Sequence, residues 1–216
     1  MVHVILFSGG LDSVTLAYHV LHTKCKKGDF LILHNFLTDE LISNAQTNSK
    51  IFTIVDDLVD KGADIGVPVH YKNDKLKVEE VFGSETAFVP FRNTLFIFNV
   101  LYDYYQLSKD SKYEGVKVYL GAIDNQVEGH GDCTTEFIKA VNDLIKVQFN
   151  DDPKMEVIAP FVHLTKYDIL LIANSFNVPI EKTWSCLFPS WFEEGNPTPC
   201  GDCIKCKERE DLGIKI

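Results

Sequence analysis

Short apolar runs alternate with longer amphipathic stretches along most of the chain. The apolar runs are rich in Val, Ile and Leu, which is typical of strands buried on both faces of a parallel sheet. The stretches between them have the periodicity and length of helices that bury one face. The pattern predicts strands at 2–7, 30–34, 67–71, 116–123 and 156–161. It predicts helices at 11–22, 45–61, 92–107, 135–149 and 166–176.

Strands that alternate with helices of this length predict an α/β fold, a doubly wound parallel sheet of five strands with helices on both faces. Ligands of such sheets bind beyond the carboxyl ends of the strands. After residue 180 the alternation stops, and prolines and four cysteines take its place. We therefore expect an α/β domain at 1–180 and a small cysteine-containing lobe at 181–216 packed on it.

Composition and charge exclude several classes of protein. The chain has 216 residues, 45% of them hydrophobic, which is enough for one sizeable core. Its formal net charge of −10 argues against a nucleic-acid partner held by bulk electrostatics. No apolar stretch approaches the ~18 residues of a membrane span. The apolar start at 2–7 is too short for a signal peptide, so we expect a cytoplasmic protein that does not bind a membrane.

The loop after the first predicted strand carries the most specific signal. Its two glycines let the backbone turn and approach a ligand, while the following helix directs free amides and its positive dipole end at that ligand. Hydroxyls add donors, and the aspartate suits Mg²⁺ held against phosphate oxygens. The ordinary alternative is a glycine turn without a ligand, and the motif is neither a Walker loop nor a GxGxxG fingerprint. The loop reads Ser8-Gly9-Gly10-Leu11-Asp12-Ser13. It resembles the PP-loop of ATP pyrophosphatases, which cleave ATP between its α and β phosphates.

The C-terminal cysteines have the spacing of a metal site. Cys200, Cys203 and Cys206 form two overlapping CxxC turns, and Cys186 precedes them by fourteen residues. Four thiolates delivered by short turns favour tetrahedral Zn²⁺, with an iron–sulfur cluster or disulfides as alternatives. Four protein ligands leave no open position, so we expect a structural zinc that holds a tail too poor in core residues to fold alone.

Five blocks in order resemble the QueC family, the 7-cyano-7-deazaguanine synthases. The Asp-Cys block and the cysteine tail are more selective than the PP-loop, which many relatives share. The blocks are Ser8–Ser13, Val89-Pro90-Phe91-Arg92-Asn93, Gly129-His130-Gly131-Asp132-Cys133, Leu164-Thr165-Lys166 and the four cysteines. The resemblance implies a ligase that uses Mg²⁺ and ATP to adenylate 7-carboxy-7-deazaguanine. Ammonia then gives the amide, and a second activation gives the nitrile. It also implies a homodimer.

The resemblance also implies roles for individual residues. Nucleotide binding falls to Ser8, Gly9, Gly10, Leu11, Asp12, Ser13 and His34. Catalysis falls to Asp12, Ser13, Lys166 and Arg92, and substrate binding to Arg92, Asn93, Gly129, Asp132 and Cys133. Lys166 follows Thr165, and a Thr-x-x-Asp pattern with Asp168 predicts a capped helix start. The duller alternatives are a solvated Lys166, a surface Arg92, a glycine-rich connector at 129–133 and a small buried Cys133.

The chain departs from the family pattern on the substrate side. His34-Asn35-Phe36-Leu37-Thr38 replaces a Tyr-Gly-Gln segment, and Gln126–Gly131 replaces an aspartate-aromatic-Ser-Gly-Tyr-Pro run. Thr134 stands where the family has arginine, and Phe91 where it has glycine. Two other functions therefore stay open: an antiphage-defence enzyme that couples the deazaguanine to an amine of a partner protein, and a nucleotide-sensing module without turnover. The acidic charge and the cysteine spacing disfavour tRNA thiolation.

Overall fold

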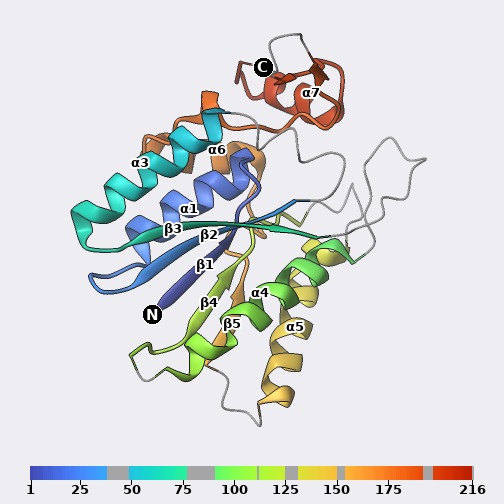
Figure 1. Ribbon diagram of the computed structural model, residues 1–216. Coiled ribbons are helices and arrows are strands. Elements are labelled where there is room, and N and C mark those ends of the chain that lie inside the picture. Colours follow the sequence, from blue (N-terminus) through green and yellow to red (C-terminus); the bar gives the residue numbers. More distant parts are fainter. Residues whose placement is uncertain are drawn as a thin grey trace.

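A computed structural model describes residues 1–37, 49–76, 91–110, 112–124, 131–149, 154–191 and 197–215. Its centre is a five-stranded sheet in the order β3-β2-β1-β4-β5, with every neighbouring pair parallel. The strands are β1 Val2–Leu6, β2 Phe30–Leu37, β3 Val69–Lys75, β4 Val116–Tyr119 and β5 Met155–Ile158. The predicted parallel five-stranded α/β fold is confirmed (Figure 1).

Helices cover both faces of this sheet, as a doubly wound fold requires (Figure 1). One apolar core lies between the sheet and three helices, α1 Leu11–Thr23, α3 Ser49–Ile65 and α6 Lys166–Ser175. A second core lies between the opposite face and two helices, α4 Arg92–Lys109 and α5 Thr135–Gln148. Among the described helices, none combines the length and apolar character that crossing a bilayer needs.

The position of β1 explains where a ligand can bind. All five residues of β1 are buried, and Val4 pairs with Ile32 on one side and Val118 on the other. The chain leaves β1 toward α1 on one face, whereas β4 continues toward the far edge of the sheet. The strand order therefore reverses next to β1, and the carboxyl end of that strand opens into the crevice where such sheets bind ligands.

Four of the five strands have boundaries that differ from the sequence pattern by more than one residue. The strand predicted at 30–34 continues to Leu37. The strand predicted at 116–123 ends at Tyr119, and Gly121 then passes the first turn of α1, where a Cβ would lie 3.4 Å from the Asp12 carbonyl carbon and the Ser13 nitrogen. The strand predicted at 156–161 ends at Ile158, before a turn that contains Pro160. β3 starts later and continues to Lys75, because backbone pairing with β2 extends it through polar residues that carry no apolar signal.

The C-terminal residues contain elements that the sequence pattern did not indicate. They are a 3₁₀ turn at Ile180–Lys182, a two-stranded ribbon of β6 Ser190–Trp191 and β7 Pro197–Thr198, and helix α7 Ile204–Asp211. The buried Arg209 fastens α7 to the preceding segment: its guanidinium donates to Thr183 Oγ1 at 2.7 Å and to the carbonyls of Ile180 and Lys215. Figure 1 shows α7 at the end of the molecule that faces the start of α1.

Candidate active site

The loop between β1 and α1 has the backbone conformation that its glycines predict. Gly9 has a φ of +78°, and a Cβ there would lie 2.6 Å from the Cδ1 atom of Ile51. The left-handed backbone would strain any side chain at this position, and a Cβ would also displace the end of the Ile51 side chain on α3. The loop can bring its own backbone close to a ligand at the positive end of α1.

Serine side chains hold the loop in a closed ring. Ser13 Oγ accepts from the Ser8 amide at 3.2 Å and lies 3.1 Å from Ser8 Oγ. Ser8 Oγ also accepts from the Gly10 amide at 3.3 Å, and Ser13 Oγ lies 3.2 Å from the Gly10 carbonyl, to which it can donate. Each hydroxyl has one proton, so these contacts define a small network whose donors can be redirected to phosphate oxygens.

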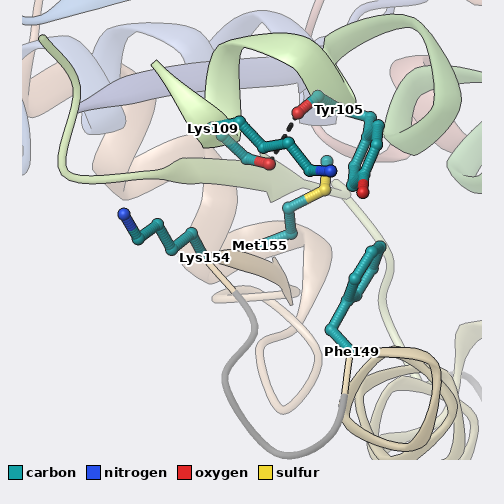
Figure 2. A pocket seen from close by; sticks show the side chains of 6 residues that line it. Tyr105, Lys109, Phe149, Lys154 and Met155 are labelled. Carbon is teal, nitrogen blue, oxygen red and sulfur yellow. Dashed lines mark hydrogen bonds between the residues drawn. The ribbon is translucent and has the colours of Figure 1, made fainter. Parts of the chain in front are cut away.

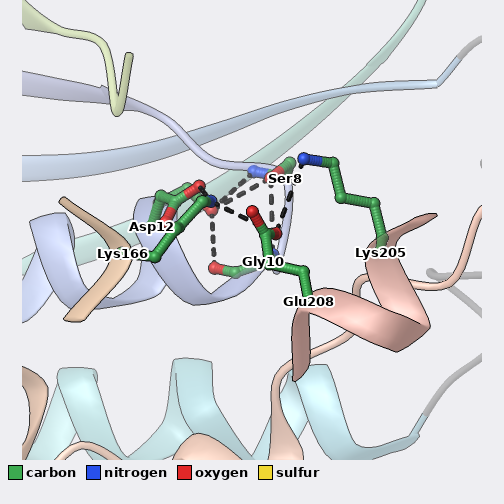
Figure 3. A network of polar contacts seen from close by, with 7 residues as sticks. Ser8, Gly10, Asp12, Lys166, Lys205 and Glu208 are labelled. Atoms are coloured by element: carbon green, nitrogen blue, oxygen red, sulfur yellow. Dashed lines mark hydrogen bonds and ion pairs between the residues drawn. The ribbon is translucent and has the colours of Figure 1, made fainter. Parts of the chain in front are cut away.

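Lys166 reaches this loop from the other end of the chain. Its Nζ donates to Asp12 Oδ2 at 2.5 Å and lies 3.6 Å from Oε2 of Glu208 on α7 (Figure 3). A capping box sets the start of α6: Thr165 Oγ1 accepts from the Asp168 amide at 3.2 Å, and the Thr165 amide donates to Asp168 Oδ2 at 2.9 Å. The predicted capped start of this helix is confirmed, and it points Lys166 at the loop.

In the described part of the chain, an ammonium group and an unpartnered carboxylate oxygen meet at Asp12. Burial opposes the charge of Lys166, but the carboxylates of Asp12 and Glu208 outweigh it and raise the pKa of the Lys166 ammonium, which stays protonated at neutral pH. The second oxygen of Asp12, Oδ1, is buried without a hydrogen-bond partner among the described residues. A carboxylate oxygen left without a partner beside a glycine-rich loop at a helix N-terminus fits an oxygen-seeking cation such as Mg²⁺.

The predicted substrate residues form a second group at the starts of α4 and α5. The Asn93 amide donates to Asp132 Oδ2 at 3.3 Å, and Asn93 Nδ2 donates to the Asp132 carbonyl at 3.1 Å and lies 3.5 Å from Cys133 Sγ. Arg92 opens α4 beside them and is exposed. Gly129 lies outside the described residues. The structure therefore brings Asn93, Asp132 and Cys133 together.

Cys133 is a thiol rather than a thiolate at neutral pH. Burial and the neighbouring carboxylate of Asp132 raise the pKa of Cys133 to about 11, although Arg92 opposes this shift. A nucleophilic cysteine requires a lowered pKa. The surroundings of Cys133 therefore suit hydrogen bonding and packing better than nucleophilic attack.

The side chain of His34 is directed away from the PP-loop. It is fully buried, with Nε2 3.0 Å from Asp74 Oδ2, Nδ1 3.3 Å from the Tyr104 hydroxyl, and its ring stacked on Phe36. Burial and nearby Lys72 lower the pKa of His34 despite the carboxylate of Asp74. Only the His34 backbone touches the start of the loop, where its carbonyl accepts from the amide of Phe7 at 2.8 Å. The predicted role of His34 in nucleotide binding stays a prediction.

The four predicted metal ligands converge in the C-terminal lobe. The Sγ atoms of Cys186, Cys200, Cys203 and Cys206 all lie within 4.8 Å of one another. Two of the separations are 3.6 Å, between Cys186 and Cys200, and 4.0 Å, between Cys200 and Cys206. Disulfide sulfurs would lie about 2 Å apart, whereas a tetrahedron with metal–sulfur bonds of about 2.3 Å places its sulfurs about 3.8 Å apart. The cluster therefore fits one tetrahedral metal ion.

Backbone amides also point at these sulfurs. The Cys200 amide donates to Cys186 Sγ at 3.2 Å and the Cys203 amide to Cys200 Sγ at 3.4 Å. Burial opposes ionisation, but amide donors at Cys203 and Asp202 lower the pKa of the Cys200 thiol to about 7. These amides favour a thiolate at Cys200, the form that binds metal, whereas burial raises the pKa of the Cys186 and Cys206 thiols in the absence of a metal ion.

Comparison with known proteins decides the family. The family model "Queuosine biosynthesis protein QueC" matches residues 2–212, nearly the whole chain. The chain belongs to the QueC family. Two relatives named 7-cyano-7-deazaguanine synthase are similar over most of both chains. The one from Nitratiruptor sp. is 27% identical over 95% of this chain and 90% of its own. The one from Trichodesmium erythraeum is 28% identical over 98% and 96%.

A solved structure supports the same fold. It is described as a 4-thiouridine synthetase–RNA complex with bound ATP, and it matches 98% of this chain and 49% of its own length with a TM-score of 0.53. Sequence identity is 14%, so this likeness bears on the fold alone. It fits a divergent QueC member built on the PP-loop architecture.

Two departures from the QueC pattern have structural explanations. Phe91, in place of glycine, keeps a left-handed backbone with a φ of 58° and exposes its ring. Thr134, in place of arginine, caps α5: its Oγ1 accepts from the Phe137 amide at 3.2 Å and donates to the Gly131 carbonyl at 2.9 Å. The replaced segment at 126–130 lies outside the described residues.

Two contacts at the loop between β1 and α1, one of them with its partner Lys166, were not predicted from the sequence. Glu208 approaches Lys166 from α7, and the Trp184 amide donates to the Gly9 carbonyl at 2.9 Å. Trp184 Nε1 also donates to the Cys186 carbonyl at 3.2 Å. No sequence signal distinguishes Glu208 from its charged neighbours on α7, since its contact depends on how the cysteine lobe docks.

The described residues also line a shallow pocket away from this site. Its volume is about 240 Å³, and Figure 2 shows Tyr105, Lys109, Phe149, Lys154 and Met155 around it. The rings of Tyr105 and Phe149 stack with centroids 5.3 Å apart, and Lys109 Nζ lies 4.4 Å from the Tyr105 ring. Met155 begins β5, so this pocket lies at the amino end of the strands, opposite the PP-loop. It is not part of the QueC-type site.

Proposed function

We propose that the chain is an ATP-dependent ligase that adenylates the carboxylate of 7-carboxy-7-deazaguanine and transfers the acyl group to ammonia. The contact between Asp12 and Lys166 carries this proposal, because it joins a carboxylate and a cation at the end of a phosphate-binding loop. Membership of the QueC family and the synthase names of the two full-length relatives support the substrate. Those names favour it over a protein-coupling or sensing role.

In the first half-reaction, a substrate carboxylate oxygen attacks the α-phosphorus of ATP and pyrophosphate leaves. The loop amides and the hydroxyls of Ser8 and Ser13 would bind phosphate oxygens, and Lys166 would neutralise charge that moves onto the leaving pyrophosphate. Arg92, at the start of α4, is a second candidate cation. The resulting acyl-adenylate has AMP as a good leaving group in place of a carboxylate oxygen.

In the second half-reaction, ammonia attacks the acyl carbon and AMP leaves, which gives the primary amide. The amide oxygen then attacks a second ATP at its α-phosphorus, and pyrophosphate leaves again. Loss of the remaining N–H proton expels AMP and forms the nitrile. Two ATP molecules thus become two AMP and two pyrophosphate, and both carboxylate oxygens leave on AMP.

Asn93, Asp132 and Cys133 are the proposed binding residues for the deazaguanine. An ionised Asp132 accepts hydrogen bonds from the amino and ring N–H groups of a guanine-like base. Asn93 already holds the Asp132 backbone and side chain in place. Cys133, as a neutral thiol, would pack against the ligand edge. Gly129 would belong to the same loop.

Two metal ions belong to the proposal. Asp12 would hold Mg²⁺ through its orphaned Oδ1, and the ion would offset phosphate charge when bound. The four cysteines would hold Zn²⁺ as a closed structural site, since all four ligands are protein thiolates. This zinc would stabilise a lobe at 181–216 without taking part in the chemistry.

The proposal is tested by incubating the protein with Mg·ATP and ammonium, with and without 7-carboxy-7-deazaguanine. Pyrophosphate and small-molecule products are followed together by mass spectrometry. We expect pyrophosphate release that depends on the deazaguanine, with the amide appearing before the nitrile. An acyl-adenylate that accumulates in the presence of ammonium would instead support coupling to another amine, and the absence of pyrophosphate release would support a nucleotide-sensing module.

A further inference from the structure

α7 carries both a cysteine of the cluster and a carboxylate of the PP-loop site. Cys206 is fully buried among the cluster sulfurs, and Glu208 lies two residues further along the same helix. Figure 3 shows the Glu208 carboxylate directed at Lys166 and Lys205, with Oε2 at 3.6 Å and 3.5 Å from the two ammonium nitrogens. A short helix thus connects the lobe directly to the cation of the ATP site.

Lys166 stands in an unfavourable place for a cation. It opens α6, so the positive end of that helix repels its ammonium group. Only 26% of the side chain is exposed, so water compensates this repulsion poorly. Two carboxylates therefore hold the ammonium group, Asp12 at 2.5 Å and Glu208 at 3.6 Å.

Nucleotide binding would affect the two carboxylates differently, because only Asp12 would also contact the metal ion. Asp12 follows the PP-loop and is the proposed ligand for the cation that accompanies ATP, so its charge would be shared with that ion. Glu208 comes from a different element, so it would keep its contacts with Lys166 and with its neighbour Lys205 on α7. The lobe also touches the loop itself, since Trp184 donates to the Gly9 carbonyl and Cys186 follows two residues later.

We propose that Glu208 is a positioning residue for the ATP chemistry: it fixes Lys166 at the PP-loop while Asp12 is engaged with the nucleotide's metal ion. The cysteine lobe would then have a second task besides its own stability, namely to deliver this carboxylate on α7. This inference rests on the proposed function, because it assigns a partner to the cation of that site.

The kinetic test compares Glu208→Gln with Glu210→Gln, an exposed glutamate on the same helix. Removing the charge of Glu208 lessens the repulsion of ATP, so KM for ATP should stay constant or fall. The value of kcat should fall about tenfold, because Lys166 loses one of the two carboxylates that hold its ammonium group. Glu208→Asp, which keeps the charge on a shorter side chain, should recover part of kcat, and Glu210→Gln should match the parent protein.

A second readout does not depend on turnover. The rate at which an amine-reactive ester modifies Lys166 without nucleotide is measured by peptide mass spectrometry. Lys166 should react faster in Glu208→Gln than in Glu210→Gln, because one of its two anchors is gone. This rate tests the inference even if the parent protein shows no deazaguanine-dependent pyrophosphate release, a result that would contradict the proposed function instead.

Metal content and thermal stability separate positioning from simple docking of the lobe. Positioning predicts that Glu208→Gln keeps the parent metal content and melting temperature while kcat and Lys166 labelling change. Loss of metal together with a rise in KM would assign Glu208 to holding the lobe and would overturn the inference. Unchanged kcat and unchanged labelling would overturn it as well.

Discussion

Lys166 Nζ and Asp12 Oδ2 lie 2.5 Å apart although 154 positions separate them in the sequence. Asp12 belongs to the first turn of α1 and Lys166 to the first turn of α6, two helices that pack side by side on the same face of the sheet. Both helices therefore direct their positive ends at one place. That place combines helix dipoles, loop amides and a cation, and Asp12 keeps one oxygen without a partner for a metal ion.

Replacing Asp12 by Asn should stop ATP turnover with little loss of fold. Asparagine keeps the size of the side chain but cannot hold Mg²⁺ or pair with Lys166 as a carboxylate does. We expect deazaguanine-dependent pyrophosphate release to fall about a hundredfold or more, the scale of losing one preorganised charge-stabilising group. The control is Asp60→Asn, an exposed aspartate on α3. Unchanged release from Asp12→Asn would contradict the assignment of the PP-loop.

Cys133 should be dispensable as a nucleophile. Because its pKa is raised to about 11, its thiolate fraction at pH 8 is small and should grow about tenfold with each pH unit until the pH nears that value. Alkylation of the native protein at Cys133, followed by peptide mass spectrometry, should show this dependence, and Cys133→Ser should keep most of kcat. Fast alkylation at neutral pH together with complete inactivity of Cys133→Ser would show a nucleophile instead.

The cysteine lobe should lose its metal when one ligand is removed. Cys203→Ser should abolish stoichiometric zinc in elemental analysis and lower the melting temperature by about 5 °C or more, as expected for a structural site in a chain of this size. Cys25→Ser is the matched control, because Cys25 lies outside the cluster. Full stability without any bound metal in the parent protein would refute the structural site.

Phe91 gives a stability prediction that is independent of any ligand. Its φ of 58° is costly for a residue with a bulky side chain, and the residue is 74% exposed, so little packing is lost on truncation. Phe91→Gly should stabilise the protein by about 1 kcal/mol. Phe91→Ala keeps the strain and should give no such gain. Thermal unfolding of both variants measures the difference, and equal effects would contradict the strain.

The apolar pattern was sufficient for the fold because the central strands β1, β2 and β4 are largely buried on both faces and the helices on one. It located β1 to within one residue and predicted the order of the main elements. It could not find the polar extension of β3 to Lys75, which only pairing with β2 stabilises. The short helix α7 was missed for a similar reason, because it is rich in charged residues and buries only Cys206 and Arg209.

In the candidate site, too, the sequence showed the local motifs but not the contacts that depend on how distant elements pack. The PP-loop, the capping pattern around Lys166 and the cysteine spacing are local signals, and the structure brings each set of residues together. The contact of Glu208 with Lys166 depends on docking of the lobe, which no local pattern encodes. The nucleotide-binding role of His34 was implied by the resemblance and stays a prediction. The alternation of side chains along β2 turns its ring toward Tyr104 on α4.

The most direct test of the account follows the oxygen atoms of the substrate. 7-Carboxy-7-deazaguanine whose carboxylate oxygens carry the oxygen-18 isotope is incubated with the protein, Mg·ATP and ammonium. The masses of the AMP, pyrophosphate and orthophosphate formed are then measured by mass spectrometry. Adenylation predicts one heavy oxygen in each AMP and none in pyrophosphate. Heavy oxygen in orthophosphate, formed together with ADP, would show attack at the terminal phosphate and would contradict the account.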